Sequence, residues 1–289
     1  MTDDLREGAL TLPDGRRIGY LESGAPGGLP VFAFHGLPGS RRQRHPDASL
    51  ARAAGVRVLQ LERPGFGLSS PSPGRRLLDW PRDVAACADV LGIDRFAVAG
   101  ISGGGPYAAA CAHALGDRVL RTAIVSGVGP PGSMPRGMIP LARLGFALAP
   151  RWPGAVRAVI RPFAGVAVSA PHRYLDHITA QMAAADRPIL ARPEVRAMFA
   201  QDYQAAFAQG VRAFSEDLAI LAAPWGFAPG AIAVPLALWH GDADRMVPAS
   251  ASRVLAAAIP GAEARFHPGE GHFMVFDRWA EVLAWLTRE

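Results

Sequence analysis

Residues 97–115, AVAGISGGGPYAAACAHAL, place a single serine between a short apolar run and an alanine-rich run. The apolar run is typical of a buried β-strand, and the alanine-rich run is typical of an α-helix. At their junction, Gly100, Ser102 and Gly104 match the pattern G-x-S-x-G, in which a strand turns sharply into a helix and exposes the serine hydroxyl. The turn strains the backbone at the serine, so side chains larger than glycine two residues away on either side would clash. Ser102 is therefore a candidate nucleophile, which needs a base and an acid elsewhere in the chain.

Short apolar segments alternate with amphipathic ones through the first half of the chain. Residues 30–36, 56–65 and 121–129 contain near-continuous apolar runs, which are typical of buried strands in a parallel sheet. Ahead of them, Asp14 and Gly15 predict the tight turn of a β-hairpin. The alternation predicts an α/β fold with a mainly parallel sheet that helices cover on both faces.

The pattern changes after residue 129, where strand-like runs give way to helical segments rich in Ala, Arg, Met and aromatic residues. Six prolines interrupt these segments: Pro150, Pro153, Pro162, Pro171, Pro188 and Pro193. The α/β alternation resumes at residues 234–242, VPLALWHGD. Because the core would lack its last strands otherwise, we interpret residues 130–232 as a helical cap inserted into a core of residues 1–129 and 233–289.

Composition excludes several classes of function. The formal net charge is +5, but every basic residue is arginine, and the arginines are scattered instead of forming a stripe with aromatic residues. This distribution disfavours a nucleic-acid partner. The N-terminal residues lack the apolar core of a secretory signal, and no stretch resembles a charge-free membrane span. We therefore expect a cytoplasmic bacterial protein with no membrane partner.

Two acid candidates follow the apolar run at 234–242. Asp242 and Asp244 both come just after this predicted strand. A serine nucleophile with a histidine base needs such an acid to fix the tautomer of the imidazole. Residue type alone leaves both aspartates open, since an aspartate here could also cap the helix that begins near Ser250.

The base candidate is selected by position. Of the eight histidines, only His272 lies on a glycine-flanked turn after the acid candidates and before the last predicted helix. An imidazole at this place can accept the proton of Ser102 while its other nitrogen faces a carboxylate. His272 is therefore the predicted base.

A fourth segment supplies candidates for an oxyanion hole. Two backbone N–H groups must point at the negative charge that develops on a tetrahedral intermediate. Gly103, the residue after the nucleophile, would supply one of them. The loop at residues 34–40, FHGLPGS, would supply the other from Leu37, because Pro38 has no N–H.

These four segments together resemble the α/β-hydrolase superfamily, in the branch of capped serine hydrolases such as esterases and proline iminopeptidases. The resemblance covers nearly all of residues 10–289 and is weakest across the cap. It implies an eight-stranded, mainly parallel sheet with helices on both faces and an inserted helical cap. The superfamily pattern G-x-x-D-x-x-V-P implies that Asp244 is the acid. Residues 62–69, ERPGFGLS, also fit the superfamily, and we interpret them as a structural loop that shapes the site.

The resemblance also narrows the reaction. Haloalkane dehalogenases and epoxide hydrolases use an aspartate where this chain has Ser102. Proline iminopeptidases typically carry Trp after the nucleophile, and peroxidase-like members and C–C bond hydrolases often read S-M-G-G, whereas Gly103 stands here. The resemblance thus implies hydrolysis of an ester, lactone or thioester. The alternatives are a small-molecule receptor with slow turnover, an aminopeptidase, a peroxidase-like enzyme or C–C bond hydrolase, and a non-catalytic scaffold.

The sequence defines substrate contacts less well. We expect a small, largely apolar substrate, because the predicted cap is rich in aromatic residues. The candidate contact residues are His35, Trp152, Phe163, Phe207 and Phe273. We expect no cofactor and no metal, since Cys87 and Cys111 are interpreted as reduced core thiols and the other residue types lack ligand spacing. A small-molecule substrate is the expected partner, and a homodimer stays open.

Overall fold

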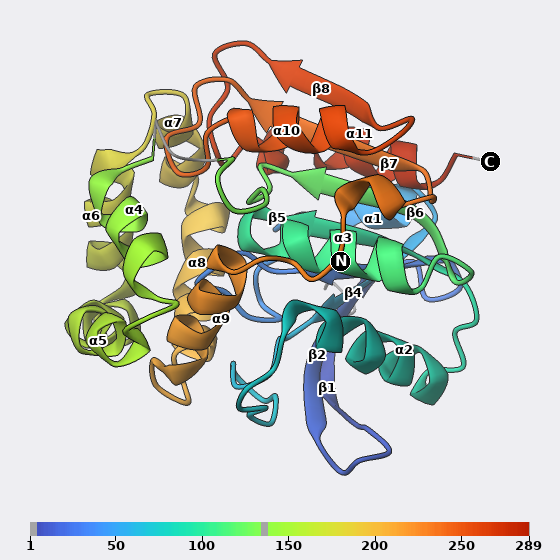
Figure 1. Cartoon of the computed structure of the whole chain (residues 1–289), viewed down its shortest axis with the longest axis horizontal. Helices are drawn as coiled ribbons and strands as arrows, with labels where there is room; N and C mark the ends of the chain where they lie inside the picture. The colour runs from blue at the N-terminus through green and yellow to red at the C-terminus, as the bar shows by residue number, and fades with distance from the viewer. Residues whose placement is uncertain (1–4, 134–137, 289) are drawn as a thin grey trace.

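The computed structural model describes residues 5–133 and 138–288, and within them eight strands form one sheet (Figure 1). The order across the sheet is β1-β2-β4-β3-β5-β6-β7-β8. The strands are β1 Arg6–Thr11, β2 Arg17–Gly24, β3 Leu29–Phe34, β4 Val56–Leu61, β5 Phe96–Ile101, β6 Val119–Val125, β7 Leu236–Gly241 and β8 Glu263–His267. Strand β2 is antiparallel to β1 and β4, and every other neighbouring pair is parallel. The predicted eight-stranded, mainly parallel sheet is confirmed, and so is the hairpin at its edge.

Helices cover both faces of this sheet, as the apolar strands predict. One face packs on α1 (Ser49–Ala53) and α11 (Val275–Leu286). The other packs on α2 (Trp80–Val90), α3 (Gly105–Ala114) and α10 (Ser250–Ala258). Alternate residues of each strand pack against the helices of opposite faces, because successive side chains of a strand point to opposite sides of the sheet.

Six helices lie between β6 and β7 along the chain and pack beside the sheet (Figure 1). They are α4 Pro140–Leu148, α5 Pro153–Ser169, α6 Pro171–Gln181, α7 Asp186–Ala191, α8 Pro193–Ala206 and α9 Arg212–Ala222. Short 3₁₀ turns complete the described elements: η1 Leu77–Asp79, η2 Ser102–Gly104 and η3 Pro229–Ala231. This insert has the place and helical character predicted for a cap.

Prolines set the starts of these helices more than their ends. Pro140, Pro153, Pro171 and Pro193 each stand at a first helical position, where the missing N–H costs nothing. The expectation that Pro162 interrupts a helical segment is wrong, since it lies inside α5. None of the described helices combines the length and the apolarity that crossing a bilayer requires. Both cysteines are buried free thiols, as predicted.

The junction of β5 and α3 has the geometry that its glycines predict. Ser102 adopts φ +55°, a left-handed conformation that residues other than glycine rarely adopt. A Cβ added at Gly100 would lie 2.4 Å from the carbonyl oxygen of Gly104, and one added at Gly104 would lie 2.2 Å from that of Phe34. Both contacts are with backbone atoms, so the turn admits no side chain at either position.

The elbow makes a prediction about stability. Gly104→Ala should lower the free energy of unfolding by roughly 3 kcal/mol, because β3 and the elbow must separate to admit a methyl group. Gly165→Ala is the matched control, since a Cβ there meets no atom within 4 Å in the middle of α5. It should raise stability by up to about 1 kcal/mol through helix propensity. Urea unfolding measures both, and equal stability of the two variants would contradict the steric account.

Candidate active site

The structure brings Ser102, His272 and Asp244 into one hydrogen-bonded chain. The Oγ of Ser102 lies 3.0 Å from Nε2 of His272, and Nδ1 of His272 lies 2.7 Å from Oδ2 of Asp244. The other oxygen of Asp244 accepts the backbone N–H groups of Met246 and Val247 at 2.8 and 2.9 Å. The three residues follow β5, β8 and β7, so the carboxyl edge of the sheet assembles them.

Burial and neighbouring charges set the protonation states of Asp244 and His272. Burial raises the pKa of Asp244, but the His272 charge and the hydrogen bonds from His240 and His272 outweigh it and hold the pKa at about 2. Burial lowers the pKa of His272, and the adjacent Asp244 carboxylate more than compensates and raises it. With Nδ1 donating to Asp244, Nε2 is left to accept the Ser102 hydroxyl, which is the arrangement a general base needs.

Asp242, the other acid candidate, makes a different contact. Asp242 accepts the backbone N–H of Gly269 at 2.7 Å and so fixes the turn that precedes His272. Of the two acid candidates, the structure therefore brings Asp244 to the imidazole. The buried His240 also approaches Asp244, with 3.3 Å between Nε2 and Oδ2, a contact that its place inside β7 did not suggest.

The two predicted oxyanion donors are neighbours in space. A Cβ added at Gly103 would lie 3.1 Å from Cβ of Leu37 and 3.3 Å from its backbone nitrogen. Within the described part of the chain, no acceptor takes up the N–H of Leu37. Glycine after the nucleophile thus lets the loop after β3 approach the elbow closely, which a larger side chain would hinder.

A buried guanidinium holds this loop. Arg63 donates to the carbonyl oxygens of His35 and Gly36, and its Nε donates to Asp217 of α9 at 2.6 Å. The Arg63 side chain is fully buried, so its charge is balanced by that carboxylate. The ERPGFGLS segment is therefore part of the support of the Leu37 loop and also binds the cap.

Three fully buried aspartates of the insert contact the loops of the core, and sequence reasoning missed all three. Asp217 accepts from Arg63, Arg75 and the hydroxyl of Tyr107. Although burial raises the pKa of Asp217, the two guanidinium charges outweigh this and hold the pKa at about 2. No local pattern distinguishes the three, because each has a polar neighbour in the sequence: Arg187 follows Asp186, Gln201 precedes Asp202 and Glu216 precedes Asp217.

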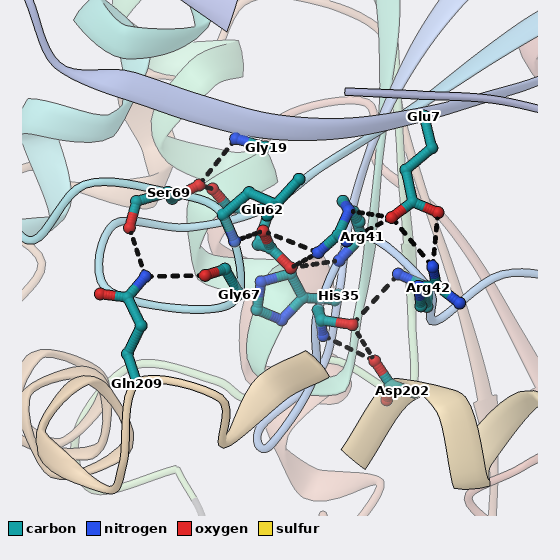
Figure 2. A network of polar contacts seen from close by, with 12 residues as sticks. Glu7, Gly19, His35, Arg41, Arg42, Glu62, Gly67, Ser69, Asp202 and Gln209 are labelled. Atoms are coloured by element: carbon teal, nitrogen blue, oxygen red, sulfur yellow. Dashed lines mark hydrogen bonds and ion pairs between the residues drawn. The ribbon is translucent and has the colours of Figure 1, made fainter. Parts of the chain in front are cut away.

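Asp202 of α8 also binds the loop after β3 (Figure 2). It accepts the backbone N–H and the hydroxyl of Ser40, both at 2.7 Å, and the amide of Gln43 at 3.1 Å. Gln43 in turn accepts the N–H of Gly36. Burial outweighs these donors and raises the pKa of Asp202 to about 7. Figure 2 also shows Gln209 reaching from the cap to the carbonyl oxygens of Gly67 and Ser69.

Asp186 of α7 contacts the loop that carries the base. It accepts the backbone N–H of Phe273 at 2.8 Å, and its carboxylate lies directly against Gly271, where a Cβ would approach it to 2.3 Å. Its second oxygen is buried without a hydrogen-bond partner among the described residues. Burial raises the pKa of Asp186, and its charge in turn contributes to the raised pKa of His272.

Two cavities meet at Ser102. The larger, about 220 Å³, has Ser102, Gly103 and Leu37 at its base and the apolar side chains of the insert as its walls. The smaller, about 80 Å³, extends past His272 toward polar side chains that include Gln43. The site therefore has room on both sides of the hydroxyl, as a substrate cleaved in its middle requires.

Of the five predicted substrate-contact residues, three line a cavity and two do not. Phe163 and Phe207 line the larger cavity, and Phe273 lines the smaller one. His35 and Trp152 line neither, which corrects the prediction for both. The His35 ring is buried, with Nδ1 bonded to Gly36 and Nε2 accepting the N–H of Arg63, whereas Trp152 is 62% exposed at the start of α5. No group of metal-ligating side chains gathers among the residues that the structure describes.

Comparison with known proteins agrees with this architecture. A family model described as alpha/beta hydrolase fold matches residues 30–278. A non-heme chloroperoxidase of Streptomyces lividans is 34% identical over 99 residues, which are 34% of this chain and 36% of that protein, so the match spans about a third of the curated relative.

Two solved structures illustrate the shared fold. An esterase from Exiguobacterium antarcticum superposes with a TM-score of 0.74 at 17% identity, over 98% of this chain and 100% of that one. An enol-lactonase from Burkholderia xenovorans gives 0.71 at 22% identity, with coverage of 98% and 100%. Because the family model spans most of the sequence and the sheet and its insert have the matching topology, the chain belongs to the α/β-hydrolase fold family.

Proposed function

We propose that this protein is a serine hydrolase that cleaves carboxylic esters through an acyl-enzyme on Ser102, with lactones and thioesters as related substrates. The observation that carries the proposal is the hydrogen-bonded chain from Ser102 through His272 to Asp244 at the base of an apolar cavity. A small-molecule substrate is part of the proposal. A cytoplasmic location and a homodimer stay predictions.

In the first half of the proposed reaction, Oγ of Ser102 attacks the carbonyl carbon while Nε2 of His272 accepts the hydroxyl proton. The carbonyl oxygen becomes an oxyanion that the N–H groups of Leu37 and Gly103 would bind. Each such donor stabilises the transition state by roughly 3 kcal/mol. His272 then donates its proton to the leaving alcohol, and the acyl group stays on Ser102.

In the second half, water attacks the acyl carbon while His272 accepts its proton. The carboxylic acid leaves, and the proton returns to Ser102. Asp244 stays ionised throughout, since its pKa is about 2, and it stabilises the transient imidazolium. Substrate and products would occupy both cavities, with the leaving group on the His272 side.

Ser102→Ala should abolish hydrolysis of a p-nitrophenyl ester series from acetate to octanoate, a loss of about 10⁶-fold in kcat. Ser126→Ala is the matched control, because Ser126 also lies buried after a central strand with φ +48° but does not contact His272. The parent and this control should turn over many times per protein. Hydrolysis that survives in Ser102→Ala would refute the nucleophile, and labelling by a fluorophosphonate with less than one turnover would indicate a receptor.

A second candidate reaction follows from the chloroperoxidase relative. In it, hydrogen peroxide takes the place of water, attacks the same acyl carbon and leaves as a peracid, while the proton returns to Ser102 through His272. The similarity over 99 residues supports this candidate, although Gly103 departs from the S-M-G-G pattern of such relatives. Bromination of a dye with acetate, peroxide and bromide distinguishes it from simple hydrolysis.

The proposed base makes kcat/KM depend on pH. Only neutral His272 can accept the serine proton, so kcat/KM should rise with pH through the pKa of His272, which lies above its ordinary value. Asp244→Asn removes the charge that raises this pKa, so the midpoint of the rise should move to lower pH and kcat should fall about 10⁴-fold. Asp242→Asn, in the same loop, should change neither. An unmoved midpoint in Asp244→Asn would contradict the assigned acid.

Asp186 should act on the same profile as a positioning residue. Asp186→Asn keeps an acceptor for the N–H of Phe273 but removes the charge, so the midpoint should move to lower pH by less than in Asp244→Asn. Asp186→Ala should also loosen the loop that carries His272 and lower kcat by up to about 100-fold, the effect of roughly 1 Å of misplacement. The control is Asp176→Asn, an exposed partner of Arg196. A loss of stability with an unmoved midpoint would assign Asp186 a purely structural role.

A further inference from the structure

The outer face of α5 is apolar where a surface helix is normally polar. Its exposed residues Ala155, Ala158, Val159, Pro162 and Val166 follow helical spacing, and the exposed polar residues of α5 are Arg161 and, at the last position of the helix, Ser169. Val159 is 51% exposed and Val166 is 43% exposed. The apolar side chains of such a stripe form no hydrogen bonds to water, so the stripe indicates a surface that contacts an apolar environment.

Neighbouring residues extend this stripe. No residue of α4 is buried, and Leu141 and Leu144 are about half exposed. Trp152, which precedes α5, is the most exposed large hydrophobic residue of the described chain. We call the set Leu141, Leu144, Trp152, Val159 and Val166 the cap patch. Figure 1 shows α5 at the edge of the insert away from the sheet, and exposed apolar residues of this kind mark an interaction site.

The charged side chains of α4, of α5 and of the turn between them have a single sign. Between Asp117 and Asp176 the sequence contains no acidic residue. Four arginines lie on or between α4 and α5: Arg143, Arg151, Arg157 and Arg161. Within the described residues, no carboxylate forms an ion pair with any of these four. An apolar helix face with Trp and flanking arginines has the composition of segments that lie in a membrane interface, and it complements an anionic one.

The cap patch is continuous with the larger cavity. Leu141, Leu144 and Val159 are exposed and also line that cavity, whose base is Ser102. The described residues of its wall include no Asp, Glu or Arg. An apolar chain in this cavity can therefore extend from these exposed residues to Ser102 without meeting a carboxylate or a guanidinium, and the polar residues of the wall include His177 and Gln181.

We propose that the cap patch docks on an anionic lipid surface and that the substrate is a long-chain acyl ester taken from that surface. The substrate part of this inference rests on the proposed ester hydrolysis, whereas the docking part does not. Composition predicted no membrane partner. We depart from that prediction because Leu141, Leu144 and Val159, from two different helices, are exposed and line the same cavity.

Sedimentation with vesicles tests the docking. The full-length protein should bind vesicles of equimolar phosphatidylglycerol and phosphatidylcholine at low salt. Binding should weaken in high salt and on pure phosphatidylcholine, because the arginine attraction is screened or lost. Trp152→Ser/Val166→Ser should lower the partition coefficient at least about tenfold, since inserting even one large apolar side chain contributes that much.

The design separates docking from folding and from catalysis. Neither Trp152 nor Val166 lines a cavity, and serine is a favoured residue at a helix N-cap, the position of Trp152. The matched control is Val90→Ser/Val254→Ser, which replaces two exposed valines of α2 and α10, outside the insert. It should bind vesicles like the parent, and both double variants should hydrolyse a soluble short-chain ester like the parent. On a dispersed long-chain ester, the cap variant alone should lose rate, at least fivefold by the same partition argument.

Three results would overturn the proposal: no binding of the parent to anionic vesicles, equal loss of binding in the control, or a dimer in light scattering that only the cap variant dissociates. The third would assign the cap patch to a second copy of the chain. Ser102→Ala should bind vesicles like the parent while hydrolysing nothing. Vesicle binding with retained hydrolysis in that variant would instead reject the proposed function and leave the docking in place.

Discussion

The buried guanidinium of Arg63 is the constraint on which the site depends. A charge without access to water must satisfy its donors within the protein, and Arg63 does so on the carbonyl oxygens of His35 and Gly36 and on Asp217. These bonds fix the backbone directly before Leu37, whose N–H faces the elbow. They also bind α9 to the core. Loss of Asp217 would leave the Arg63 charge buried and unpaired, which typically costs about 3–5 kcal/mol, whereas Asp217 without Arg63 would keep its ion pair with Arg75.

The helical insert is joined to the rest of the fold by the same kind of contact at two further places. Asp202 binds the Leu37 loop through Ser40 and Gln43, and Asp186 binds the loop that carries His272. Helices α8 and α9, which line the cavities, thus also contact the loops next to Ser102 through Asp202 and Asp217. A displacement of the insert would therefore move the loops of the predicted oxyanion donors and of the predicted base together. Apolar contacts in place of these hydrogen bonds would allow the insert to slide over the loops.

Much of the fold and of the candidate site could be predicted from the sequence because both are local. The glycines around Ser102 are required by backbone contacts of the elbow itself, and the acid and base follow consecutive strands of a parallel sheet, whose carboxyl ends meet at one edge. The two wrong contact residues have a common cause. His35 lies two residues before Leu37 in the sequence, and Trp152 belongs to the insert that is rich in aromatic residues. Whether a side chain faces a cavity, a neighbouring loop or solvent depends on tertiary packing, which no local sequence pattern records.

The sequence by itself determined the α/β class, the insert and the identity of Ser102, His272 and the acid candidates, because strand periodicity and turn chemistry act over a few residues. The tertiary structure brings Asp244, and not Asp242, to His272, as the superfamily pattern G-x-x-D-x-x-V-P implied, since a single loop turns the two aspartates in different directions. It alone also revealed the three buried aspartates of the insert and the apolar outer face of α5. The aspartate contacts join residues 87 to 162 positions apart, and the exposed face of α5 depends on which side of the helix other elements cover, so neither can be read from the neighbouring sequence.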